Sequence, residues 1–349
     1  MRLAAPPSRP AAVIAFAMCL LAAIASTALA AKTDVLVLKN GDRITGEVEL
    51  LERGRLTFST DDMGTLAIEW DKVASVTAAA SFEIEDLKGG QYFGSLRPAP
   101  DSGAVAIVER DGTRVVELLS VARISRLGAS FWERLEGAVD VGASYTSSSD
   151  LYKLDLGAES RYERPGYALS ANASATLSRQ PEVEDTRRAT LGINASRRRP
   201  NRWLYFTQGL LEANPQLGYN LRGALAGGMG RYIVKSLKDD FLAGAGLSVN
   251  REDPLEGENT TNPEILVVLQ YGRFSYDFPK VDTQFTFTGY EGINDWERFR
   301  LEVDARIRRE VFKDFDVTLR GYESYDSRPA TADAANNDFG LSFALSWTY

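Results

Sequence analysis

The sequence predicts an all-β protein in which a 12-stranded antiparallel transmembrane β-barrel follows two small SH3/Sm-like β-barrel repeats. Three observations support this prediction. The last 11 residues, 339–349, alternate strictly between large apolar side chains and small or hydroxylated ones, as expected for a strand with two unlike faces. Long runs with the same alternation fill the chain from 135 onward, and within 34–127 the sequence repeats with a period of 48 residues. A tilted membrane strand needs about 9–11 residues, so the terminal run is long enough to cross a bilayer.

The first 30 residues, 1–30, predict a cleaved export signal. Arg2 and Arg9 precede an apolar stretch, 11–24, and Ala28-Leu-Ala30 is a small-x-small cleavage site. The alternative, a retained membrane anchor, is disfavoured because the apolar stretch is shorter than the roughly 20 residues that a transmembrane helix needs. We therefore expect an exported protein.

Composition argues against several classes of function. Cys19 is the only cysteine and lies within the signal, so its removal leaves no disulfide or thiolate metal site. The chain has no histidine, the usual general base and the commonest metal ligand. We therefore expect no enzyme, no catalytic residues, no metal and no cofactor. Removing Arg2 and Arg9 from the 40 basic residues leaves 38 against 48 acidic ones, a net charge of −10 that argues against nucleic acid as a partner.

The two predicted repeats span 31–80 and 81–128. Aligning each residue with the one 48 positions later superimposes Gly41 on Gly89 without gaps. The first copy opens with an alternating strand, an Asn40-Gly hairpin signal and a second alternating strand, and further short runs bring the expected total to five strands per copy. We interpret the paired glycines as tight turns rather than as ligand contacts.

A linker, 129–134, carries Phe131 and Trp132 where interfacial aromatic residues are expected. The predicted barrel occupies 135–349. Its 12 strands are expected near 135–146, 151–163, 167–178, 187–197, 202–212, 219–232, 240–250, 264–274, 281–290, 297–309, 314–324 and 338–349.

The tenth and second of these runs carry apolar side chains on one face and charged side chains on the other. Charges stacked on one face do not suit a sandwich core, but they suit a strand with lipid outside and water inside. The fifth and eighth runs are apolar on both faces, so their orientation stays open. The predicted lumen-lining residues are Asp140, Lys153, Asp155, Glu159, Arg161, Glu163, Arg298, Arg300, Glu302, Asp304, Arg306, Arg308 and Arg320.

The connections between runs favour one orientation. The even-numbered connections are short, as at 164–166 and 199–201, whereas several odd-numbered ones are longer, as at 180–186, 251–263 and 325–337. Bacterial barrels keep short turns on the periplasmic side. We therefore expect both barrel ends, and the repeats before them, on the periplasmic side.

At this point the chain resembles a known family. The exported N-terminus, the segment 38–46 and the barrel ending in aromatic residues resemble the YdiY-like salt-induced outer-membrane proteins, a family of unknown function that carries domain of unknown function 481. The barrel resemblance covers roughly 130–349. It implies that Phe343, Trp347 and Tyr349 resemble the signal read by the barrel-assembly machinery, and it offers no catalytic residues.

Two functions from different classes remain. The first is an integral outer-membrane β-barrel with a periplasmic accessory domain, acting as a narrow channel for ions or small polar solutes unless the lumenal charges pair across the interior and close it. The second is a structural or binding protein in which the barrel anchors a periplasmic domain that binds the cell wall or a protein partner. Outer-membrane lipid and lipopolysaccharide are expected partners of either. An autotransporter is disfavoured because 128–135 is too short for a helix that threads the pore.

Overall fold

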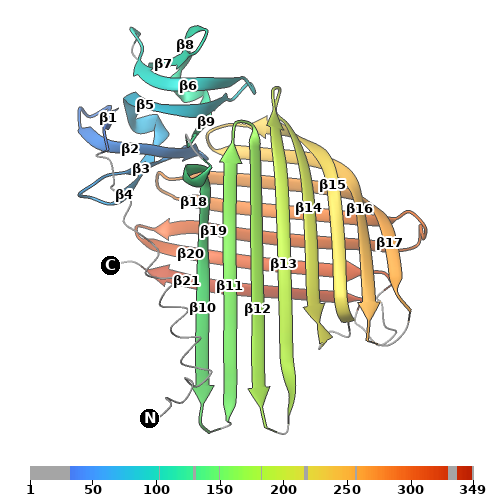
Figure 1. Cartoon of the computed structure of the whole chain (residues 1–349). Coiled ribbons are helices and arrows are strands. Elements are labelled where there is room, and N and C mark those ends of the chain that lie inside the picture. Colours follow the sequence, from blue (N-terminus) through green and yellow to red (C-terminus); the bar gives the residue numbers. More distant parts are fainter. Residues whose placement is uncertain are drawn as a thin grey trace, which may run out of the picture.

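A computed structural model describes residues 32–347 except for 102, 129–130, 149, 182, 216–218, 256–257 and 329–335. The described chain forms two antiparallel sheets, a small one of nine strands and a large one of 12 (Figure 1). Among these residues the helices are short 3-10 turns, none with the length or apolarity needed to span a bilayer. The all-β prediction is confirmed.

The small sheet contains the two sequence repeats. Its strands are β1 (Asp34–Leu38), β2 (Arg43–Glu52), β3 (Arg55–Ser59), β4 (Thr65–Glu69), β5 (Val73–Asp86), β6 (Gln91–Pro98), β7 (Ala104–Glu109), β8 (Gly112–Glu117) and β9 (Val121–Arg126), with 3-10 turns η1 (Trp70–Lys72) and η2 (Leu118–Ser120). They follow the order β4-β3-β2-β1-β5-β6-β7-β8, and β9 pairs with both β2 and β5.

The 48-residue period appears directly in the strand register. Val35 pairs with Thr77 in the first copy, and Glu83 pairs with Ser125 in the second, so both partners are displaced by the same 48 positions. The 14-residue strand β5 belongs to both copies, because its first half pairs with β1 and its second half with β9. The repeat is therefore confirmed, with the two copies joined through one continuous strand.

Both copies contribute to a single hydrophobic core. Trp70 is its largest side chain and is fully buried. Its indole N–H donates a hydrogen bond of 2.7 Å to the carbonyl oxygen of Leu118, the residue that the repeat places opposite it. This bond satisfies the one polar atom that a buried tryptophan carries, and it fastens η1 of one copy to η2 of the other.

The large sheet runs from β10 to β21 in sequence order, with every neighbour antiparallel. A 3-10 turn, η3 (Trp132–Arg134), precedes it. The strands are β10 (Leu135–Thr146), β11 (Leu151–Arg164), β12 (Tyr167–Gln180), β13 (Val183–Arg199), β14 (Trp203–Asn214), β15 (Tyr219–Lys235), β16 (Asp239–Pro254), β17 (Thr260–Ser275), β18 (Val281–Gly292), β19 (Phe299–Phe312), β20 (Phe315–Asp326) and β21 (Asn337–Trp347). Each lies within a few residues of its predicted range.

Two connections are shorter than predicted. Most of the loop expected at 251–263 is strand, because β16 runs to Pro254 and β17 begins at Thr260. The segment 180–186 was expected to be a longer loop, but β12 continues to Gln180 and β13 begins at Val183. The strands extend because the ladder survives an irregularity between Ser178 and Gln180, after which Gln180 still pairs with Val183. Polar side chains here therefore mark the end of a long hairpin and not a loop.

The large sheet curls, so that its first strands cross in front of its last ones (Figure 1). Residues from β12 and β19 line one cavity, which shows that the curl encloses an interior. Within the described residues β10 and β21 are paired with β11 and β20 only, so the curled sheet has two free edges. Both edge strands expose almost every side chain.

The shared core of the small sheet yields a prediction. Trp70→Ala removes a fully buried aromatic ring and should lower the stability of the small sheet by about 3–5 kcal/mol. Trp132→Ala, at a side chain that is 77% exposed, is the matched control and should change little. Hydrogen–deuterium exchange of the β1–β9 amides in the full chain measures the difference. Equal protection in the two variants would contradict the role given to Trp70.

Candidate functional site

The strand register assigns every predicted lumen-lining residue except Arg298, which precedes β19, to one face of the large sheet. Asp140 lies opposite Gly157, which shares a face with the charged residues of β11. The same face continues strand by strand to β19, where Arg308 lies opposite Thr318 of β20. We call this face the inner face, because residues from eight of its strands line a common cavity.

The outer face is apolar and exposed. Its largest side chains alternate with the inner-face residues along each strand, and on β21 they include Phe343 and Trp347, which are 64% and 69% exposed. Tyr349, the last residue of the predicted assembly signal, lies outside the described residues. The two faces therefore differ sharply in polarity, as the alternation predicts.

The charges of the inner face pair locally. Arg298 binds Asp326 at 2.9 Å and Arg308 binds Asp316 at 2.7 Å, each across one pair of neighbouring strands. On β11, Lys153 binds Asp155 at 3.0 Å and Arg161 binds Glu163. Within the described chain, neither Arg298 nor Arg308 forms an ion pair with an acidic residue of β10 or β11. Among the described residues these four pairs therefore join charges of the same strand or of neighbouring segments.

Six other predicted residues on this face stand without an ion pair among the described residues. They are Asp140, Glu159, Glu302, Asp304, Arg306 and Arg320, of which Arg306 has a buried Nε atom with no hydrogen-bond partner. The interior therefore keeps polar groups that are free to meet a solute, and it is not a fully satisfied charge network.

The most buried charge of the interior is one that the sequence did not reveal. Glu264 of β17 is 1% exposed, and Arg300 binds both of its carboxylate oxygens, at 2.8 and 2.7 Å. Ser248 donates a third hydrogen bond of 2.9 Å. The guanidinium of Arg300 also lies 4.5 Å from the ring centre of Tyr290. A buried ion pair is tolerated when it is bidentate and makes additional hydrogen bonds, as this one does.

This cluster forms one wall of a cavity of about 310 Å³. The wall facing it carries side-chain amides from three neighbouring strands, Asn172, Asn194 and Gln208. Arg222, Asn250 and Glu302 complete the polar lining. The site therefore offers hydrogen-bond donors and acceptors but no nucleophile–base pair.

The small sheet covers the end of the large sheet at which the even-numbered connections lie (Figure 1). Glu83 of β5 is 2% exposed and accepts hydrogen bonds from the backbone N–H of Gly166, at 2.9 Å, and from Arg198, at 3.2 Å. Gly166 belongs to the turn 165–166 and Arg198 lies beside the turn 200–202. A charge buried in this way fixes the position of the small sheet, because leaving either partner alone is costly.

Three further turns of the same end contact the small sheet. Arg202 donates a hydrogen bond of 3.0 Å to the carbonyl oxygen of Leu87. The hydroxyl of Tyr276 donates one of 3.1 Å to the carbonyl oxygen of Arg53. Leu237, in the turn 236–238, packs against the hydrophobic core of the small sheet. Gly54 permits this approach, since a Cβ there would lie 2.7 Å from the Leu237 carbonyl oxygen.

Charged groups surround this covered end. Arg123 of β9 lies 3.4 Å from Glu163 and 3.3 Å from Glu52, and Ser125 donates to Glu163 at 2.9 Å. Glu163, a predicted lumen-lining residue, therefore binds the small sheet. Burial raises the pKa of the Glu85 carboxyl, an effect that the positive charges of Lys235, Arg198 and Arg123 reduce.

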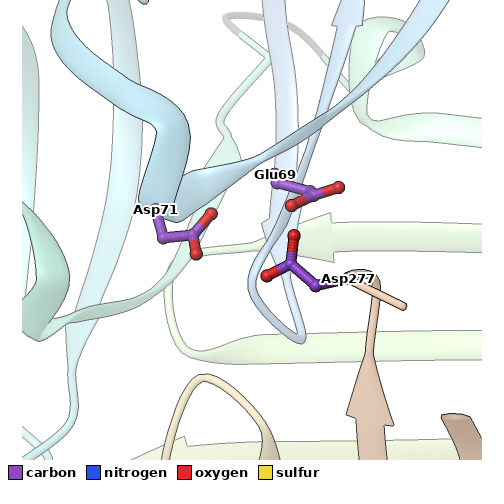
Figure 2. A group of neighbouring side chains, drawn as sticks. All are labelled: Glu69, Asp71 and Asp277. Carbon is purple, nitrogen blue, oxygen red and sulfur yellow. The ribbon is translucent and has the colours of Figure 1, made fainter. Parts of the chain in front are cut away.

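Glu69, Asp71 and Asp277 form an acidic group at the edge of the covered end (Figure 2). Their carboxylate oxygens lie within 4.8 Å of one another, a spacing that suits a cation. Lys72 already supplies one, because its Nζ lies 3.3 Å from Asp277 and 3.8 Å from Glu69. The hydrogen bond to Asp277 accordingly raises the pKa of Lys72. The group acts as an ion pair between the two sheets.

Sequence reasoning missed Glu264 and Gln208, because their runs gave no clear orientation, and it also missed Asn194. It also missed the docking residues Glu83 and Arg198, and it expected the repeats only to lie beside the barrel in the periplasm. Two signals pointed to docking. The turn at 198–202 holds an unusual density of arginine, and Leu237 is an apolar side chain within a polar turn.

Comparisons with known proteins give one match. A protein-family model described as "Protein of unknown function, DUF481" matches residues 139–349, which cover the large sheet from β10 onward. Neither the curated proteins nor the solved structures yield a match.

The docking contact yields a prediction. Glu83→Gln leaves Arg198 without its buried counter-charge and should weaken docking by about 3–5 kcal/mol. Limited proteolysis of the full chain should then cleave the 129–134 linker faster. Glu109→Gln, which breaks an exposed ion pair with Arg114 inside the small sheet, is the matched control and should leave cleavage unchanged. Equal cleavage of both variants would show that this contact does not hold the sheets together.

The buried cluster yields a second prediction. Arg300→Leu leaves the buried Glu264 carboxylate without its counter-charge and should lower the free energy of unfolding by about 3–5 kcal/mol. The folded chain should then unfold at a lower temperature in detergent. Arg306→Leu changes the same residue type on the same strand and face, where no ion pair is broken among the described residues. Gel migration after heating to a series of temperatures measures both. A drop of similar size in the two variants would refute the importance of the pair.

Proposed function

The chain belongs to the DUF481 family of proteins of unknown function, and from its geometry we propose that it is an outer-membrane β-barrel forming a narrow conduit for small polar solutes. The sheet of β1–β9 is its periplasmic accessory domain and covers one mouth of the conduit. The observation that carries this proposal is the contrast between the two faces of the large sheet. One face exposes a broad apolar surface, and the other encloses polar and charged side chains.

Lipid is the environment that suits the outer face. Val139, Phe339 and Leu341 are each more than 70% exposed. Contiguous apolar surfaces of this extent are rare on proteins that live in water. The strands of 11 to 17 residues exceed the roughly 9–11 that a tilted membrane strand needs. Outer-membrane lipid and lipopolysaccharide are therefore the partners that we assign to this face.

A bilayer also determines what becomes of the free edges. Backbone N–H and carbonyl groups in hydrocarbon must be hydrogen-bonded within the protein. β10 and β21 run in opposite directions, since they are the first and last of 12 strands in which every neighbouring pair is antiparallel. We therefore assign them to each other in the membrane, where their pairing closes the barrel.

The orientation follows from export and from the turns. The predicted signal at 1–30 sends the chain out of the cytoplasm, and barrels keep their short turns on the periplasmic side. The accessory domain docks on those turns, so we assign it to the periplasm. Phe343, Trp347 and Tyr349 are assigned to recognition by the barrel-assembly machinery.

The second candidate is a barrel that only anchors its accessory domain. The docking contacts favour it, because four turns and a buried ion pair hold the domain firmly across the mouth. In that case the domain binds the cell wall or a periplasmic protein, and nothing passes through the barrel. Conduction separates the two candidates.

The proposal predicts two measurements. The full chain should fractionate with the outer membrane and change its gel migration on boiling, as folded barrels do. In planar bilayers the native protein should give small conductance steps, and Glu83→Gln should give larger or longer ones, because the covering domain is held less tightly. Glu109→Gln is again the control.

Each outcome has a distinct meaning. A chain recovered as a free periplasmic protein would overturn membrane insertion. An inserted, heat-modifiable barrel with no steps above lipid background, in either the native protein or Glu83→Gln, would overturn the conduit and leave the anchor.

A further inference from the structure

We propose that the interior cavity bounded by Asn172, Asn194, Gln208 and Asn250 is a binding site for a neutral, hydroxyl-rich solute of about the size of a monosaccharide. The inference deepens the proposed conduit by naming the class of solute, and it rests on that proposal for its biological meaning.

The charges that line the cavity cancel. Two arginines, Arg222 and Arg300, face two glutamates, Glu264 and Glu302. Arg300 and Glu264 neutralise each other directly, at 2.7 Å. An anion entering the cavity would meet two carboxylates, and a cation would meet two guanidinium groups. A neutral solute meets neither penalty, so the electrostatics favour an uncharged occupant.

The amide wall offers hydrogen bonds of both kinds. Asn194 lies opposite Gln208 in the ladder of β13 and β14, so their side chains emerge side by side on the inner face. Asn172 projects from the next strand, where Gly192 leaves room for its amide. None of the three amides has a hydrogen-bond partner among the described residues. A side-chain amide donates and accepts, and a hydroxyl group does the same. Polyhydroxylated solutes therefore match this wall best.

The opposite wall has an unmet acceptor. Asn250 is 2% exposed, and its Oδ1 atom has no hydrogen-bond partner in the described structure. The Nε atom of Arg222 also has no hydrogen-bond partner in the described structure, although the Glu252 carboxylate lies 3.5 Å from it. Buried polar groups are normally paired, and each unpaired one is unfavourable. One hydroxyl group can satisfy both kinds of atom, since it donates to an amide oxygen and accepts from a guanidinium.

The size of the cavity limits the occupant. About 310 Å³ lies at the lower end of the range of small-molecule sites, roughly 300–1,000 Å³. One sugar ring suits this volume better than a chain of several. Asn250 and Glu264 of the lining lie near the ends of β16 and β17 that are remote from the covered turns.

The test measures binding without a membrane. The full chain is prepared in a zwitterionic detergent that contains no sugar, and saturation-transfer NMR follows D-glucose, with D-glucuronate and D-glucosamine as its anionic and cationic analogues. D-Glucose should show saturable transfer and bind more tightly than both charged analogues. The Asn194→Leu/Gln208→Leu variant should weaken glucose binding about tenfold or more, because it removes two pairs of hydrogen-bonding groups.

The matched control is Gln270→Leu. Gln270 also lies on the inner face without a hydrogen-bond partner among the described residues, but it does not line the cavity. Heat-modifiability establishes that each variant is folded. Should the double variant fail to fold, Asn172→Ala removes one amide of the same wall with a smaller change and should weaken glucose binding severalfold.

The proposal is overturned by the absence of glucose binding, by equal binding in the cavity variants and in Gln270→Leu, or by tighter binding of either charged analogue. These failures differ from failure of the proposed conduit. Binding in detergent can fail while the bilayer shows conductance steps, and it can succeed while the bilayer shows none.

Discussion

The unbroken register of the large sheet is the constraint on which the rest of the structure depends. In a strand, successive side chains alternate between faces, so a slip of one residue would exchange the two faces of that strand. Across β10 to β21 the irregularities fall near strand ends, at positions such as Ser178, Glu212 and Glu310, and the central pairs keep one alternation throughout. Glu264, Arg300 and Ser248 come from three different strands, and they meet only because the register of all the strands between them agrees. The buried ion pair in turn resists any slip, because a slip would separate two buried charges.

Alternation also explains how much could be predicted from the sequence. The runs ending at Trp347 and containing Arg300 carry opposite polarity on their two faces, so they revealed both their type and their orientation. The period of 48 residues, marked by Gly41 and Gly89, likewise predicted the repeat whose register the small sheet displays. Glu264 was different. Its run, from Ile265 to Leu269, is apolar on both faces, so a single sequence gives no reason to turn Glu264 inward. Only pairing with β16 and β18 determines its side, and pairing is a property of neighbours rather than of the run.

Docking of the small sheet was beyond prediction for a similar reason. In the sequence, Glu83 has the pattern of an ordinary surface residue of an alternating strand. Arg198 is one of several arginines before a turn that contains a proline. Their contact joins positions 115 residues apart and exists because Glu83 alternates along β5 with the core residues Phe82 and Ile84 and so points to the opposite face. A contact of this kind depends on two completed folds. The sequence offered its components, an arginine-rich turn and the apolar Leu237, without the geometry that joins them.

The two ends of the large sheet differ in how their polar groups are satisfied, and this difference bears on mechanism. At the covered end the charges have protein partners: Glu83 has Arg198, Glu163 has Arg123 and Asp277 has Lys72. These groups join the small sheet to the large one, so they serve to hold the small sheet in place. In the interior cavity the amides of Asn194 and Gln208 have no partner within the described chain. Hydrogen-bonding capacity is therefore left free in the cavity where we propose that a solute binds, and it is used where the two sheets meet. A barrel that served only as an anchor would have no need of that division, since its interior amides could have been paired or replaced by apolar packing at no loss of docking.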